Sequence, residues 1–214
     1  RKRIFMKDLT KGPPSKVMIS FAIPVALGNI FQLCYSLADT RVVGSTLGEA
    51  ALAAVGATTS ISTLFIGFLS GLTNGFALLI ARQFGAGDKR GVTRYGAGCL
   101  LLGGITALLL TAACVGSLPF ILKLLNVPDA LMGQSTAYIR AVLLGLLATM
   151  LYNGCASILR AVGDTAAPLL FLLFAAVLNV ALDLLFILKF GFGVAGAAWA
   201  TVLSQSLSAL ISLV

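Results

Sequence analysis

The sequence predicts an all-α polytopic membrane protein with six transmembrane helices, and its composition and charge spacing carry this prediction. Of the 214 residues, 59% are hydrophobic and 10% are charged, with a mean hydropathy of +1.04. Soluble domains average about 45–50% apolar and about 25% charged residues. Stretches free of Asp, Glu, Lys and Arg recur along the chain, and about 20 apolar residues cross a bilayer core. After an N-terminal segment 1–16, they predict spans over about 17–43, 50–82, 95–118, 132–159, 167–188 and 194–214.

The basic residues lie between the predicted spans and favour alternate loops. Eleven Lys and Arg residues fall in segments on the side of the N-terminus, against four in the opposite segments. Cytoplasmic loops carry such an excess. We therefore expect a multi-pass cell-membrane protein with a cytoplasmic N-terminus. The net charge of +8 then reflects topology, and we expect no nucleic-acid partner.

Residue types that several enzyme classes need are missing from this sequence. It contains no His, and its four cysteines stand singly in apolar stretches: Cys34, Cys99, Cys114 and Cys155. No zinc, haem or thiol-relay spacing results. The Gly-containing loops after residues 82 and 160 lack the Gly-Lys-Ser/Thr ending of a phosphate-binding P-loop. We expect a protein that is not an enzyme and needs no cofactor.

Two carboxylates inside the predicted spans are the best candidates for function. A charge within a span costs about 2.5–3.5 kcal/mol unless it faces the bundle interior or a watery cavity. The helical rise places Asp183 about 24 Å across the membrane, and Asp39 also lies towards the outer end. Arg41 follows closely, so Asp39 could instead be a solvated helix-end charge. Polar side chains on the same faces or at the same depth are Gln32, Tyr35, Asn179 and Thr201.

Oxygen groups of this kind, with no Lys or Arg expected at their level, suit a proton or a hard cation such as Na⁺. Asn153 is a further cavity candidate, although amides also join helices by ordinary hydrogen bonds. Pro24 predicts a bend in the first span, because proline removes a backbone hydrogen bond. A stripe of glycines in the second span predicts close packing against another helix: Gly67, Gly71 and Gly75.

Several segments in order resemble the N-terminal half of a multidrug and toxic compound extrusion (MATE) transporter over nearly the whole chain. They are the loops Arg82-Gln-Phe-Gly-Ala-Gly-Asp88 and Arg160-Ala-Val-Gly-Asp164, the string Leu178-Asn-Val-Ala-Leu-Asp183 and the span end Ala38-Asp-Thr-Arg41. The resemblance implies one lobe of a twelve-helix fold, completed by a C-terminal lobe. It also implies export of organic cations or amphipathic compounds in exchange for H⁺ or Na⁺.

The resemblance further assigns roles to individual residues. It implies a cation site of Asp39, Asn179, Asp183 and Thr201. It implies an adjoining substrate cavity lined by Gln32, Tyr35 and Asn153, with the first helix bending at Pro24.

Other functions stay open at this point. A lipid-linked oligosaccharide flippase of related fold would need a basic cavity, and we expect the spans to place no Lys or Arg in the interior of the bundle. An aspartyl intramembrane protease would need its two Asp residues close enough to share a proton. A non-transporting assembly subunit would show neither activity.

Overall fold

The computed structural model describes residues 13–212, so the predicted segment 1–16 falls mostly outside the described residues, as do residues 213–214. The described chain is helical throughout its regular elements, which confirms the predicted fold class. Its elements are α1 (Pro14–Leu47), α2 (Glu49–Gly85), α3 (Lys89–Leu124), α4 (Asp129–Leu144), α5 (Leu146–Ala161), α6 (Ala166–Leu184), the π-helix η1 (Leu185–Lys189) and α7 (Gly193–Ser212).

Five of the described helical segments are long and apolar enough to cross a membrane, and a bent pair adds a sixth if it forms one span. The five are Met18–Leu47, Glu49–Gly85, Lys89–Leu124, Ala166–Lys189 and Gly193–Ser212. The bent pair is α4 and α5, which meet at 45°. The helices extend beyond several of the predicted spans, since helical backbone continues into the loops.

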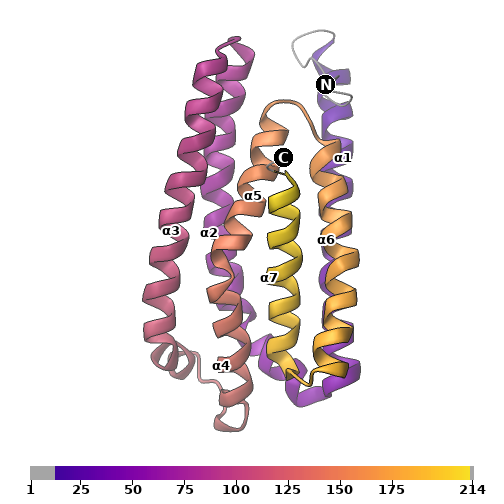
Figure 1. Ribbon diagram of the computed structural model, residues 1–214, viewed down its shortest axis with the longest axis vertical. Coiled ribbons are helices and arrows are strands. Elements are labelled where there is room, and N and C mark those ends of the chain that lie inside the picture. The colour runs from indigo at the N-terminus through magenta and orange to yellow at the C-terminus, as the bar shows by residue number, and fades with distance from the viewer. Residues whose placement is uncertain (1–12, 213–214) are drawn as a thin grey trace.

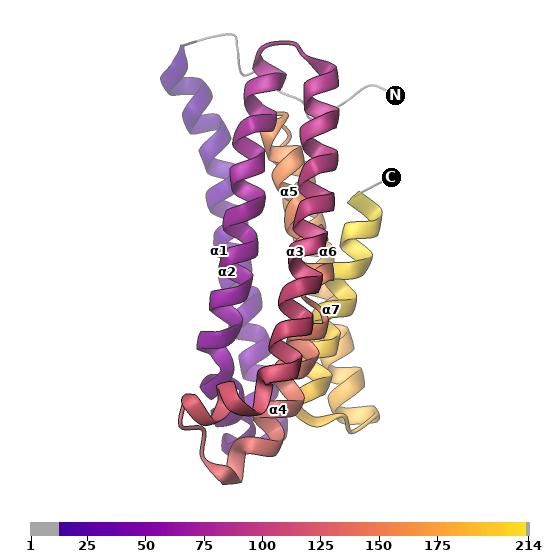
Figure 2. The same cartoon turned by 90° about the vertical axis from the view of Figure 1, so that its left-hand side faces the viewer.

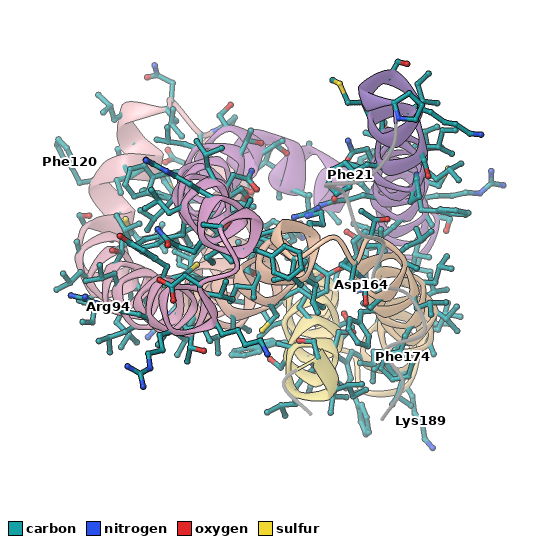
Figure 3. The ribbon with its side chains drawn as sticks, turned by 90° about the horizontal axis from the view of Figure 1, so that it is seen from above. Phe21, Arg94, Phe120, Asp164, Phe174 and Lys189 are labelled. Atoms are coloured by element: carbon teal, nitrogen blue, oxygen red, sulfur yellow. The ribbon has the colours of Figure 1, made fainter. Side chains whose placement is uncertain are left out.

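The helices run roughly along one axis (Figures 1 and 2). The start of α1 and the end of α7 lie at the same end, together with the α2–α3 and α5–α6 turns (Figure 1). We call this the proximal end, and the end with the α1–α2 and α3–α4 connections the distal end. Seen from above, α2 and α3 lie on one side, while α1 stands at the other and packs mainly on α6 (Figure 3).

The main core lies where α2, α3, α4 and α5 meet. Leu69, Leu122, Ile139, Leu146 and Met150 are buried there. The outward faces are apolar as well, which suits contact with lipid. A smaller apolar cluster at the distal end joins α1, α2, η1 and α7.

The two similar loops at the proximal end are helix-capping turns. The Asp88 carboxylate accepts a hydrogen bond from the Gly91 amide at 2.9 Å, at the start of α3. The Asp164 carboxylate accepts from the Ala166 and Ala167 amides at 3.2 and 3.0 Å, at the start of α6. Such a cap stabilises a helix by about 1 kcal/mol. The repeated Gly-Asp pattern therefore serves local structure.

The fourth predicted span is broken at Gly145, which the sequence analysis did not anticipate. A Cβ atom on Gly145 would overlap the Val202 side chain, so only glycine lets α7 approach this closely. Thr111 of α3 donates a hydrogen bond to the Leu143 carbonyl at 2.8 Å. This bond satisfies an acceptor at the end of α4, as a break within a membrane span requires.

The glycine stripe of α2 does not have the predicted role within this lobe. A Cβ added to Gly67, Gly71 or Gly75 would meet nothing within 4 Å in the described part of the chain. The expectation that these glycines pack against another helix is therefore wrong for the helices described.

The helix α1 continues through Pro24 from Pro14 to Leu47.

Candidate cation-binding site

A buried polar cluster joins α6 and α7 in the distal half of the bundle. Asp183 and Asn179 are both fully buried and lie one turn apart on α6. In the amide orientation that satisfies its neighbours, Asn179 donates to Asp183 Oδ2 at 2.9 Å and accepts from Thr201 at 3.1 Å. The amide thus links the carboxyl group to α7.

Asp39 of α1 brings a second carboxyl group to this cluster. The carboxyl groups of Asp39 and Asp183 lie within hydrogen-bonding range of each other. The Oδ1 atom of each residue is buried and has no hydrogen-bond partner among residues 13–212. Arg41 is exposed and forms no ion pair with Asp39 in the described part of the chain. The geometry therefore gives Asp39 an inward-facing carboxyl group.

Two tyrosines complete the surroundings of the carboxyl pair. The Tyr35 hydroxyl donates to Thr201 Oγ1 at 3.2 Å, which ties α1 to α7. Tyr138 of α4 lies close enough to interact electrostatically with both aspartates. The sequence analysis missed Tyr138, although its position nine residues into α4 gives it a depth similar to that of the carboxylates.

A cavity of about 120 Å³ adjoins the pair and is lined by side chains from α1, α2, α4, α5 and α7. Asp39 lies in its wall, while Asp183 lies behind Asp39. A hydrogen bond of 2.7 Å from Thr149 to Gln205 crosses the wall between α5 and α7. The lining residues are Tyr35, Ser36, Asp39, Ser62, Ile66, Tyr138, Val142, Thr149, Ala198, Thr201, Val202 and Gln205.

The structure places the other candidate residues in a second cavity, closer to the proximal end. This cavity of about 50 Å³ lies between α1, α5 and α6, and its wall includes Pro24, Gln32 and Asn153. Arg160 lines the same cavity. The expectation that no Lys or Arg faces the interior of the bundle is therefore wrong, because Arg160 in the last turn of α5 lies in the cavity wall.

The carboxyl pair can hold one proton or one cation. Two carboxylates this close repel each other, so a shared proton or a bound cation favours the arrangement. Unpartnered carboxylate oxygens together with amide and hydroxyl oxygens are ligands for a hard cation. No group of three or more His, Cys, Asp or Glu side chains suited to a metal ion occurs within residues 13–212. The groups present therefore suit reversible neutralisation of charge.

The fold and site define a polytopic helical membrane protein with a buried carboxylate pair beside a cavity within its bundle. The family model MatE matches residues 24–185. The chain belongs to this family, whose members are transporters and not enzymes.

Individual relatives and solved structures agree with the family assignment. The probable multidrug resistance protein YpnP of Bacillus subtilis is 34% identical over 96% of this chain and 46% of YpnP. The probable multidrug resistance protein NorM of Thermotoga maritima is 29% identical over 91% of this chain and 42% of NorM. The chain thus spans about half the length of the curated relatives it matches.

Solved MATE structures show the same helical arrangement over nearly all of this chain. An outward-facing MATE transporter superposes with a TM-score of 0.89 at 31% identity, covering 95% of this chain and 45% of that one. A MATE structure in the bent conformation gives a TM-score of 0.88 at 32% identity, with the same two coverages.

Proposed function

We propose that this chain supplies the N-terminal lobe of a secondary active multidrug transporter. The transporter exports organic cations or amphipathic compounds in exchange for H⁺ or Na⁺, and a C-terminal lobe completes it. The contact between Asp39 and Asp183 beside a cavity is the observation that carries this proposal. Relatives named as multidrug resistance and multidrug export proteins support the substrate class.

The coupling follows from the charge of the pair. When an ion neutralises the carboxyl groups, the wall at Asp39 no longer attracts a cationic substrate. When the ion leaves, the negative charge favours the substrate, so the two ligands compete. Tyr35 and Thr201 connect α1 to α7 at this point, so a change at the pair also changes the contacts between helices. A ligand that binds two packings unequally shifts their populations.

Measuring dye export under imposed ion gradients tests this function directly. Full-length protein in liposomes should export a fluorescent cationic dye under an inward proton gradient or an inward sodium gradient. Because the ion that the pair binds supplies the energy for export, collapsing the gradient of that ion should abolish dye export. Dye export that is independent of both the proton and the sodium gradient would contradict the proposal. Transport of a lipid-linked sugar in place of the dye would support a flippase.

We propose a cytoplasmic location for the proximal end, because α1 begins there and the α2–α3 and α5–α6 turns at this end belong to the sequence segments with the excess of Lys and Arg residues. The exposed Lys89 lies at this end and the exposed Lys189 at the distal end. In a Cys34→Ala background, a membrane-impermeant maleimide added to intact cells should label Lys189→Cys and spare Lys89→Cys. Labelling of Lys89→Cys alone would show that the proximal end faces the outside of the cell.

A further inference from the structure

Four exposed basic side chains gather around the α2–α3 turn at the proximal end. We call them the basic cluster: Arg82 in the last turn of α2, and Lys89, Arg90 and Arg94 in the first two turns of α3. Asp88 is the only acidic residue in this stretch of sequence, and its carboxylate is engaged in capping α3. None of the four cations forms an ion pair in the described part of the chain. The basic cluster therefore carries charge that this lobe leaves uncompensated.

The packing of α2 against α3 brings the four cations to nearly one level. A Cβ atom on Gly91 would lie 2.9 Å from Gln83 Cγ, and one on Gly98 would lie 3.8 Å from Phe76 Cε1. Because the two helices run antiparallel, both contacts give the same register, in which Arg82 lies level with the first two turns of α3 (Figure 2). The helical rise then confines the basic cluster to about 8 Å along the bundle axis.

The length of α3 places this level at a membrane surface. Arg94 and Lys123 bound a stretch of α3 that contains no charged residue. The helical rise from Arg94 to Lys123 is about 44 Å, which matches a bilayer of about 40–45 Å including its headgroups. When Lys123 lies among the headgroups of one leaflet, the basic cluster therefore lies among the headgroups of the other.

The outward face of α3 continues from the cations into an apolar stripe. Arg90 and Arg94 lie one turn apart, opposite the buried face that packs on α2 and α5. On the same outward face, Leu101, Ile105 and Leu108 are exposed. Figure 3 labels Arg94 on the outer side of α3. The stripe reaches about 21 Å from Arg94, enough to cover one leaflet of a core about 30 Å thick.

We propose that the outward face of α3, with the basic cluster at its head, binds an anionic phospholipid of the leaflet at the proximal end. The phosphate contacts the cations, since arginine pairs with phosphate oxygens through charge-assisted hydrogen bonds. The acyl chains lie along the apolar stripe, which a soluble phosphate would leave unused. Membrane topology accounts for basic residues in this turn, but it does not require them to share one level above an apolar stripe. The inference is independent of the proposed transport function.

Quenching of a fluorophore within the basic cluster measures which lipid collects there. Thr93 is exposed among the cations, so Thr93→Cys carries the fluorophore in a Cys34→Ala background without other exposed cysteines. Full-length protein is reconstituted in phosphatidylcholine vesicles that contain a small share of nitroxide-labelled phosphatidylglycerol or phosphatidylcholine. The two quenching curves give the binding constant of phosphatidylglycerol relative to phosphatidylcholine. This ratio should be about fivefold or more, because each cation near an anionic lipid contributes a factor of about five.

Neutralising the basic cluster should remove the preference for phosphatidylglycerol. In one variant the three cations of α3 are replaced, and the ratio should fall to within about twofold of one, since no charge of α3 then attracts the phosphate. This variant is Lys89→Gln, Arg90→Gln and Arg94→Gln. A matched variant replaces three exposed cations of the distal half and should leave the ratio at Thr93→Cys unchanged. That control is Lys123→Gln, Arg140→Gln and Lys189→Gln.

A salt titration gives the same test without any change to the cluster. Raising the salt from about 0.1 M to about 1 M shortens the screening length from about 10 Å to about 3 Å, so the ratio should fall towards one. Equal quenching by the two lipids at low salt, or an undiminished ratio in the α3 variant, would overturn the proposal. Millimolar inorganic phosphate at constant ionic strength should leave the ratio unchanged. Loss of the ratio in phosphate would assign the basic cluster to a soluble anion instead of a lipid.

Discussion

Asp183→Asn in the full-length protein is expected to abolish gradient-driven dye export while leaving membrane insertion intact. The variant keeps the shape of the side chain but removes the charge that a proton or cation neutralises. Because Asp183 is fully buried and contacts Asp39, no solvent-exposed group can replace it. Uptake of the dye into inverted vesicles is the measurement, with protein amount determined by immunoblot.

Two comparisons sharpen this expectation. Asp129→Asn removes an exposed carboxylate at the start of α4 and should leave export unchanged. Asp39→Asn should be as inactive as Asp183→Asn, and the double variant no worse, because residues acting as one unit are not additive. Full export by Asp183→Asn would rule out the role of the pair.

Gly145→Ala is expected to destabilise the lobe, although alanine favours helix more than glycine does. The added methyl group would overlap Val202 at the break between α4 and α5. Overpacking of this kind costs about 1–3 kcal/mol. Thermal unfolding in detergent, followed by tryptophan fluorescence, should show a lower midpoint for this variant.

The control for this substitution comes from α4, the helix that ends just before Gly145. Gly133 has open space around its Cα, so Gly133→Ala should hold or raise the unfolding midpoint by a small amount. Adding Val202→Ala to Gly145→Ala should recover part of the loss, because it removes the atoms that the methyl group meets. A midpoint unchanged by Gly145→Ala would show that the break does not depend on this contact.

The position of the carboxyl pair could be predicted from the sequence, because it depends on two local quantities. Helical rise fixes the depth of Asp39 and Asp183, and the cost of a charge in lipid directs both inwards. Helical spacing then places Tyr35 and Asn179 on the same faces. The structure brings these residues and Thr201 together, while their roles in ion binding remain our proposal.

The features that sequence reasoning missed depend on contacts between distant segments. Tyr138 joins the site only because α4 packs beside α7, which no spacing within α4 reveals. The break at Gly145 needs Val202 and Thr111, both far away in sequence. Arg160 was assigned to a loop because charge marked the end of the span, yet it belongs to the last turn of α5 and its side chain lines the cavity between α1, α5 and α6.

The most direct test of the central claim measures ion release when substrate binds. A cationic substrate is added to the purified full-length protein in weakly buffered detergent, with a pH-indicator dye for H⁺ and radioactive sodium for Na⁺. If Asp39 and Asp183 hold the coupling ion, about one ion should leave per substrate bound, because the two ligands compete for one site. A protein with both aspartates changed to asparagine should release none. If that variant released as many ions per substrate as the unmodified protein does, the proposed role of Asp39 and Asp183 would be contradicted.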